Sequence, residues 1–167
     1  SKLFGLDYSK GMLIEACKAS NRCTFINADA DCLPFREDKF DLIFSVNAIH
    51  FFNNKLKFIR NTSKILKRKG TLCIIEFDPH ADSTDWYIYK YFSGSYKRDI
   101  ERYPSFETMK EEMQNIGLQK ICLGLIDKIN TDKHNCSVLA DHFLDQKGSS
   151  QMAMLNQKEY ESGLNRI

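Results

Sequence analysis

The stretch GLDYSKGML, residues 5–13, predicts a β-strand that passes directly into an α-helix. A short apolar run ends at Asp7, and Ser9 is a favourable helix N-cap residue. Apolar residues then recur at the 3.6-residue helical period. Asp7 is therefore expected at the carboxyl end of a strand, where a carboxylate holds a ribose hydroxyl in many nucleotide-binding α/β folds.

Strand-like and helix-like segments alternate through the first half of the chain. Further strands are expected at 23–29 (CTFINAD), 40–46 (FDLIFSV) and 71–77 (TLCIIEF). The second of these is apolar enough for a strand that is buried on both faces. This alternation predicts an α/β fold in which a parallel sheet has helices on both faces and a ligand crevice at the carboxyl ends of its strands.

A helix is expected between the last two of these strands, with Asn53 or Asn54 as its N-cap and Gly70 at its end. The basic residues 67–69 would then occupy its last turn and complement the helix dipole. The expected buried stripe of this helix is Phe58, Ile59, Thr62, Ile65 and Leu66.

The second half of the chain begins with an aromatic, helix-prone segment at 82–103, for which Asp82 or Ser83 could be the cap. Its aromatic stripe could line a substrate pocket, but a core stripe is the favoured interpretation. A helix is expected from Ser105 to Gly117, then a strand near the sheet edge at 118–129. Asn156 and Glu159 have the spacing of a capping box.

Composition excludes several classes of protein. The chain has 167 residues, the size of one domain, and 24 basic against 22 acidic residues give a formal charge of +2. That balance argues against nucleic acid as a partner, and no apolar run approaches the roughly 18 residues of a membrane span. The six cysteines form no CxxC pair, which favours free thiols in a reducing, cytoplasmic compartment. Asp78, His80 and Asp82 form only a weak metal-ligand pattern, so no metal is expected.

Three stretches taken together resemble one family: GLDYSKGMLIEA, NADADCLPFREDKFDLIFSVNAIHFF and SKILKRKGTLCIIEFDP. They are similar to the class I S-adenosylmethionine-dependent methyltransferases, in particular to the ubiquinone and menaquinone C-methyltransferases. The resemblance covers residues 3 to about 80 well and 100–126 loosely. It implies a Rossmann-like class I methyltransferase sheet in a single partial domain over 1–167, with the cofactor-binding half in 1–80 and the substrate side in 81–167.

The resemblance also implies that the domain is truncated at both ends. The family's first strand and its glycine-rich turn would precede Ser1, and a last strand would follow Ile167. That first strand would lie between the strands at 2–7 and 40–46, so its loss would leave unpaired backbone groups and an open apolar slot.

The site that the resemblance implies lies just beyond three of the strands. It assigns Asp7 to both ribose hydroxyls, Tyr8 to the side of the adenine, Asp29 and Ala30 to the adenine edge, and the backbone near Ser45 and Val46 to the methionine moiety. Considered alone, either aspartate is more often a helix cap or a turn former. His50 is the best-placed general base, although a histidine that lines the pocket or caps a helix is the commoner case.

The expected function is transfer of a methyl group from S-adenosylmethionine to a small-molecule acceptor by in-line displacement, with S-adenosylhomocysteine as the product. The reaction needs alignment and exclusion of water more than a nucleophile or a metal. The identity of the acceptor, the methylated atom (carbon, nitrogen or oxygen) and the oligomeric state stay open at this level. Two alternatives are a non-catalytic methyltransferase-like partner subunit and a nicotinamide-dependent oxidoreductase.

Overall fold

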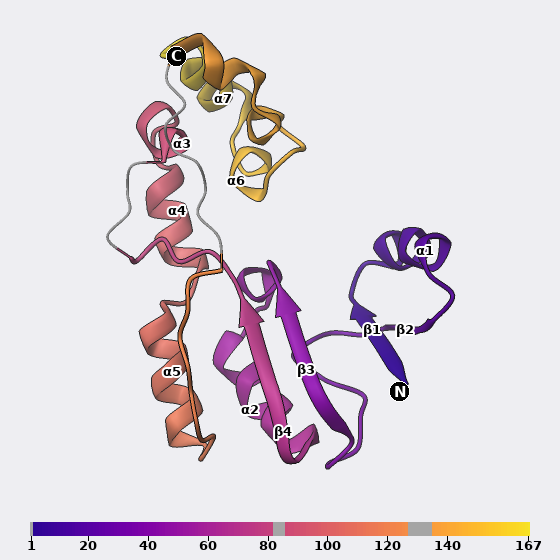
Figure 1. Cartoon of the computed structure of the whole chain (residues 1–167). Helices are drawn as coiled ribbons and strands as arrows, with labels where there is room; N and C mark the ends of the chain where they lie inside the picture. Colours follow the sequence, from indigo (N-terminus) through magenta and orange to yellow (C-terminus); the bar gives the residue numbers. More distant parts are fainter. Residues whose placement is uncertain (1, 82–85, 127–134) are drawn as a thin grey trace. The chain divides into compact units, whose positions relative to one another are not determined.

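The computed structural model describes residues 2–81, 86–126 and 135–167 (Figure 1). The strands are β1 (Leu3–Asp7), β2 (Cys23–Asn27), β3 (Phe40–Val46) and β4 (Leu66–Ile75). The α-helices are α1 (Lys10–Ala19), α2 (Lys55–Ile65), α3 (Tyr87–Tyr91), α4 (Ser95–Arg102), α5 (Phe106–Asn115), α6 (Ser150–Ala153) and α7 (Gln157–Leu164). Short 3₁₀ turns are η1 (Ile49–Phe51), η2 (Asn135–Ala140) and η3 (His142–Leu144).

The strands pair in parallel, which confirms the predicted α/β class. β1 pairs with β2 from Leu3↔Cys23 to Asp7↔Asn27, and β3 pairs with β4 up to Val46↔Ile75. These pairs form two separate two-stranded sheets. In the described ranges, β1 and β3 thus each have one edge without a strand partner.

The opening of the chain folds as the sequence predicts. α1 begins after Ser9, whose side chain accepts a hydrogen bond from the backbone N–H of Met12. β2 ends at Asn27, so Asp7 and Asn27 stand side by side at the carboxyl ends of paired strands. The β1–α1–β2 segment therefore places both strand tips at one edge of its sheet.

β3 has the predicted bounds, but the prediction that both of its faces are buried is wrong. Leu42, Phe44 and Val46 are 54%, 59% and 47% exposed, whereas Ser45 is 7% exposed. Side chains alternate across a strand, so the exposed residues share one face and Ser45 belongs to the other. The part of the chain that the structure describes covers only one face of β3.

The helix α2 is capped as predicted but ends earlier. Asn54 Oδ1 accepts a hydrogen bond from the Lys57 backbone N–H at 2.9 Å. The helix stops at Ile65, and β4 begins at Leu66, so the basic residues 67–69 lie in a strand and not in the last turn of a helix. The cause is pairing with β3: Lys67 Nζ lies 2.8 Å from Asp41 Oδ2, and a register shift next to Phe40 accommodates the extra residues.

The predicted apolar stripe nevertheless forms the buried side of α2. Phe58, Ile59, Thr62 and Ile65 are all buried. Leu66 is buried too, as the first residue of β4. On its other side, α2 is linked to α5 by an ion pair between Arg60 and Glu112, and the hydrogen bond to Glu112 raises the pKa of Arg60.

The helix α5 ends at a glycine turn, as predicted. Gly117 has a φ of 83°, its backbone N–H donates to Gln114 O, and that of Leu118 donates to Met113 O, both at 2.9 Å. This pattern is a Schellman motif. The strand predicted after it is wrong for residues 118–126, which are assigned to no strand and are exposed from Cys122 onward. The remainder of that prediction, 127–129, lies outside the described residues.

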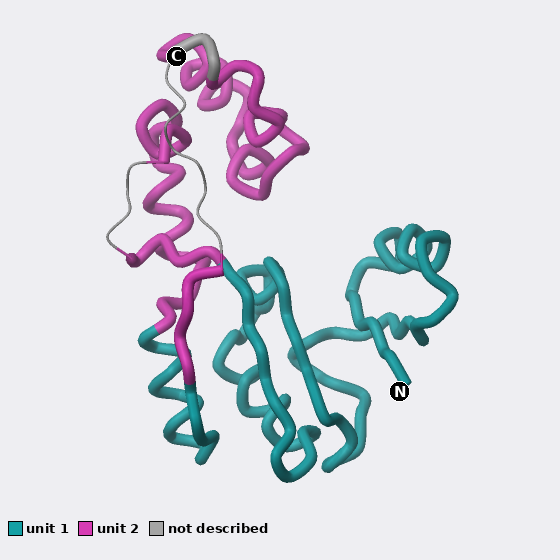
Figure 2. Tube along the Cα trace, viewed as in Figure 1, with its two compact units in different colours: residues 1–76, 107–121 teal, residues 77–106, 122–167 magenta. Residues whose placement is uncertain are grey.

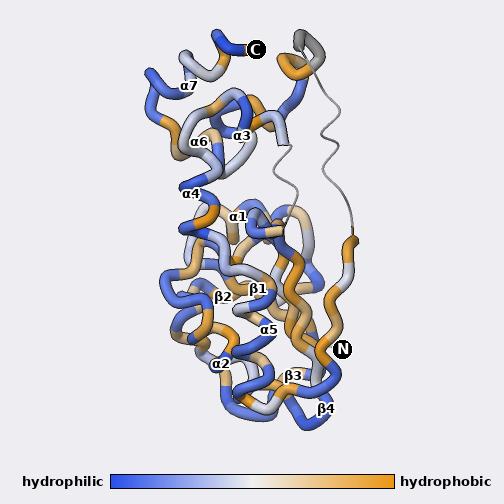
Figure 3. The backbone as a smooth tube through the Cα atoms, turned by 90° about the vertical axis from the view of Figure 1, so that its left-hand side faces the viewer, coloured by the Kyte–Doolittle hydropathy of each residue, from blue (hydrophilic) through white to orange (hydrophobic). Residues whose placement is uncertain are grey.

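The chain divides into two compact units (Figure 2): residues 1–76 with 107–121, and residues 77–106 with 122–167. In the first unit, apolar residues concentrate along β3 and β4 (Figure 3). The core of the second unit contains Trp86, Tyr87, Ile88, Tyr91 and Phe92, which confirms the interpretation of the aromatic stripe as core. Whether both units belong to one partial domain stays a prediction, and the proposed caps Asp82 and Ser83 lie outside the described residues.

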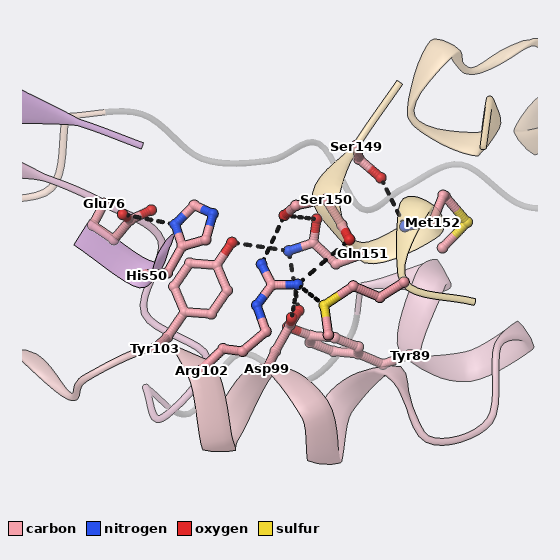
Figure 4. Close-up of polar contacts among 11 residues, drawn as sticks. His50, Glu76, Tyr89, Asp99, Arg102, Tyr103, Ser149, Ser150, Gln151 and Met152 are labelled. Atoms are coloured by element: carbon pink, nitrogen blue, oxygen red, sulfur yellow. Dashed lines mark hydrogen bonds and ion pairs between the residues drawn. The ribbon is translucent and has the colours of Figure 1, made fainter. Parts of the chain in front are cut away.

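A buried polar network links α4 to α6 within the second unit (Figure 4). The Asp99 carboxylate, 1% exposed, accepts hydrogen bonds from Tyr89 Oη at 2.9 Å and from Gln151 Nε2 at 3.1 Å. Burial, and secondarily the charge of Asp99, raises the pKa of the Tyr89 hydroxyl, so that this hydroxyl is a neutral donor. Near the carboxyl end of the chain, Asn156 and Glu159 form the predicted capping box of α7.

Substitution of Ile59 tests whether the apolar face of α2 stabilises the first unit. Ile59 is fully buried, so Ile59→Ala should lower the free energy of unfolding by about 2–5 kcal/mol through lost burial and a residual cavity. The measurement is urea denaturation followed by circular dichroism. Lys57→Ala, at an exposed position of the same helix, should change it by less than about 0.5 kcal/mol. Equal losses in the two variants would contradict this packing.

Candidate functional site

The predicted site residues lie at the carboxyl ends of the two strand pairs. At the tip of β1, Asp7 Oδ1 accepts a hydrogen bond from the Ser9 backbone N–H at 2.7 Å. One carboxylate oxygen therefore stabilises the turn into α1, as expected of a turn former. Within the described part of the chain, Asp7 Oδ2 makes no hydrogen bond, so this half-buried carboxylate can still accept one from a ligand.

Asn27 is a residue that the sequence analysis missed. Its Nδ2 donates to Asp7 O at 3.0 Å and to Tyr8 O at 2.7 Å, which ties the end of β2 to the turn after β1. The available signal was an amide residue at the strand end beside Asp7. Tyr8 itself is 79% exposed, so its ring faces solvent and not the protein core.

Asp29 and Ala30 follow β2 in a tightly hydrogen-bonded loop. Asp29 Oδ1 accepts from the Asp31 backbone N–H at 2.8 Å, and Ala30 is 7% exposed. Asp31 in turn anchors the loop to α2: its Oδ1 accepts a hydrogen bond from the N–H of the N-cap residue Asn54 at 3.3 Å, and its carbonyl accepts one from Asn61 Nδ2, in the second half of the helix, at 3.2 Å. The loop is thus held by α2.

A second group of residues lies at the tip of β3. Ser45 is buried, and its hydroxyl has no hydrogen-bond partner in the ranges that the structure describes. The next turn begins at Asn47, whose φ of 47° is left-handed and whose N–H donates to Ile75 O at 2.9 Å. This turn leads into η1, which carries His50.

His50 is paired with a residue that the sequence analysis did not single out. Its Nδ1 lies 2.9 Å from Glu76 Oε2, and the two side chains are 4% and 1% exposed (Figure 4). The ring of Phe51 lies against the imidazole, with ring centroids 4.0 Å apart. The available signal for Glu76 was its place directly after the strand beside β3, since neighbouring parallel strands bring their carboxyl ends together.

The structure assembles these residues as two groups, because β1 and β3 belong to separate sheets. The connection from β2 to β3 links the two sheets through an aromatic cluster of Phe4, Phe35 and Phe40. The Phe35 and Phe40 centroids are 4.8 Å apart, Phe4 lies 5.8 Å from Phe40, and Lys39 Nζ lies 4.7 Å from the Phe4 ring. Cation–π attraction of this kind contributes roughly 0.5–2 kcal/mol.

Two residues of the weak metal-ligand pattern, Asp78 and His80, make hydrogen bonds within the second unit. Asp78 accepts hydrogen bonds from the backbone N–H groups of His80 at 2.8 Å and of Phe106 at 3.3 Å. His80 Nε2 lies 2.8 Å from Tyr103 O. Among the residues with a described placement, no three His, Cys, Asp or Glu side chains group as a metal site would require, and no helix is long and apolar enough to cross a membrane. Asp82 lies outside this part of the chain.

Comparison with known proteins identifies relatives of this chain. Residues 1–74 match the family described as methyltransferase domain. The chain is 30% identical over 134 residues to demethylmenaquinone methyltransferase of Thermotoga maritima, covering 66% of this chain and 58% of that protein. It is 27% identical over 115 residues to a ubiquinone/menaquinone biosynthesis C-methyltransferase of Idiomarina loihiensis, and this match covers 58% of this chain and 46% of that protein. The chain thus spans about half the length of these curated relatives.

A solved structure shares the fold of nearly the whole chain. It is a protein assigned as a methyltransferase of an antibiotic biosynthesis pathway in Anabaena variabilis. The TM-score is 0.65 at 20% identity, and the match covers 98% of this chain and 67% of that one. The fold predicted from the sequence is therefore confirmed.

The left-handed turn at Asn47 can be tested by substitution. Asn47→Gly should leave the free energy of unfolding nearly unchanged, because glycine adopts a positive φ without strain. Asn47→Val should lower it by about 1–2 kcal/mol, since a β-branched residue is strained in this region. Thermal and urea unfolding measure the difference. Equal stability of the two variants would show that the turn does not require this conformation.

Proposed function

We propose that the protein transfers a methyl group from S-adenosylmethionine to a small-molecule acceptor, because residues 1–74 of this chain match the family described as methyltransferase domain. The chain spans about half the length of these relatives, so the proposal concerns the activity of the whole protein. Three features support it: the family match, the shared fold and the polar groups at the strand ends.

The observation that carries the proposal is the position of Asp7. Its half-buried carboxylate stands at the tip of β1 with one oxygen fixed by Ser9 and the other available for a ligand. A carboxylate can accept hydrogen bonds from both hydroxyls of a ribose, and charge assistance makes such bonds roughly twice as strong as neutral ones. Asn27 fixes the backbone of this turn and so preorganises the carboxylate.

The neighbouring residues suit the rest of the cofactor. We assign the exposed ring of Tyr8 to the adenine face, and Asp29 with Ala30 to the adenine edge, where a carboxylate oxygen can accept from the exocyclic amine. Ser45 and Val46 are assigned to the methionine end, because the buried Ser45 hydroxyl has no hydrogen-bond partner among the described residues. The residues present therefore fit S-adenosylmethionine, which would supply an activated methyl group.

The chain's own residues would align the acceptor, exclude water and move a proton. His50, buried at the tip of β3, is the proposed general base. The names of the relatives point to an aromatic quinone precursor as acceptor, so demethylmenaquinone is the first compound to test. The cytoplasmic location expected from the cysteine spacing stays a prediction.

The family match favours this proposal over a nicotinamide-dependent oxidoreductase, because the matched residues 1–74 include the proposed ribose-binding carboxylate and the adenine loop. A non-catalytic partner subunit differs from the proposal in its cofactor binding. Full-length protein that gives no heat with S-adenosylmethionine in calorimetry would support the partner subunit.

Asp7→Ala should weaken S-adenosylmethionine binding by more than tenfold, because the substitution removes the acceptor for the ribose hydroxyls. Isothermal titration calorimetry of the full-length protein measures the change. Asp41→Ala is the matched control, because Asp41 is also at a strand but its side chain is 82% exposed and pairs with Lys67. Equal affinity of the Asp7 variant and the unmodified protein would refute the assignment of Asp7.

A further inference from the structure

We infer that Glu76 is a positioning residue for His50, and that the acceptor carries an O–H, N–H or acidic C–H bond whose proton leaves during methyl transfer. The inference rests on the proposed function and extends it to the class of acceptor. It starts from the contact between His50 Nδ1 and Glu76 Oε2.

This contact fixes the state of the imidazole. An ionised carboxylate can only accept a hydrogen bond, so the proton of a neutral His50 must lie on Nδ1, 2.9 Å from Glu76 Oε2. Nε2 then carries the lone pair and can take up a proton. A second group that hydrogen-bonds one ring nitrogen in this way sets both the tautomer and the orientation of the ring.

Burial makes the pair more than a surface contact. Both side chains are nearly inaccessible, at 4% and 1% exposure, and a buried carboxylate is costly unless it is paired and hydrogen-bonded. When His50 takes up a proton at Nε2, the imidazolium and the carboxylate become an ion pair. Glu76 therefore stabilises the charge that forms on His50 during the reaction.

The place of the pair connects it to the proposed site. His50 follows β3 and Glu76 follows β4, so both lie at the carboxyl ends of adjacent parallel strands, where α/β sheets bind ligands. Phe51 lies against the ring and Asn47 forms the turn that leads to it. Glu76 and Phe51 thus both contact the imidazole, at the end of the sheet where Ser45 is buried.

A base of this kind defines what the acceptor must supply. As the oxygen, nitrogen or carbon of the acceptor bonds to the methyl carbon, the methyl–sulfur bond breaks and its electron pair stays on sulfur. The proton of the acceptor passes to His50 Nε2 and later to solvent. A phenol, a hydroquinone or a carbon acid satisfies this balance, whereas a thioether or a tertiary amine releases no proton.

The first test reads the tautomer directly. In the full-length protein labelled with ¹⁵N-histidine, long-range proton–nitrogen NMR should show His50 with its proton on Nδ1, with His50→Asn used to assign the signal. Glu76→Leu should shift His50 towards the mixture of tautomers of free histidine, whereas Glu111→Leu, at an exposed glutamate of α5, should not. A proton on Nε2 in the unmodified protein would overturn the inference.

The second test uses reduced demethylmenaquinone, a hydroquinone, as the acceptor probe. Glu76→Gln should lower kcat at least tenfold with KM for the probe changed less than twofold, and Glu76→Asp should restore part of the loss. Glu111→Gln should leave kcat unchanged. The melting temperature and S-adenosylmethionine affinity of each variant are measured in parallel to detect a folding defect. If Glu76→Gln does not fold, Glu76→Asp is used in its place.

The outcomes separate the inference from the proposed function. Unmodified protein without affinity for S-adenosylmethionine refutes the proposed function. Unmodified protein that binds it and methylates a thioether or a tertiary amine, but not the hydroquinone, overturns the acceptor class. If the Glu76→Gln and Glu76→Asp variants fold and neither changes kcat, the positioning role of Glu76 is overturned.

Discussion

The parallel pairing of β3 with β4 is the constraint on which the second part of the site depends. Val46 and Ile75 are partners in the ladder, so the residues that follow each strand emerge at the same edge. The backbone of Asn47 adds one further bond to Ile75 O, and the left-handed turn that follows carries His50 to Glu76. A shift of the register by one residue would reverse which side chains face each side of the sheet and would separate this pair.

Local patterns were sufficient to predict most elements, because the signals lie within a few residues of each boundary. β3 has its predicted bounds, Ser9 and Asn54 cap the helices as expected, and the glycine turn after α5 is where Gly117 predicts it. The end of α2 could not be predicted in this way. Residues 66–69 are helix-compatible, but pairing with β3 and the ion pair between Lys67 and Asp41 draw them into a strand.

The residues of the site divide in the same way, into those that the local sequence indicates and those whose role depends on residues distant in the chain. Asp7, Asp29 and His50 stand out as polar residues after apolar runs, so the sequence alone could nominate them. Asn27 and Glu76 also follow apolar runs, but that position alone did not single them out, because their significance comes from partners 19 and 26 residues away in the chain. Equally, the sequence could not show that Asp7 and Asp29 already serve turns through one oxygen each. Each carboxylate thus stabilises a turn with one oxygen and can accept a hydrogen bond from a ligand with the other.

The exposed face of β3 has a practical consequence for anyone who produces residues 1–167 in isolation. Leu42, Phe44 and Val46 form an alternating apolar row beside a strand edge without a backbone partner in the described ranges. Such rows template contacts between chains, and native proteins usually protect them with charges, proline or a covering element. A recombinant polypeptide with these bounds is therefore expected to precipitate or form inclusion bodies as its concentration rises, and a solubility-enhancing fusion partner is the sensible starting point for its purification.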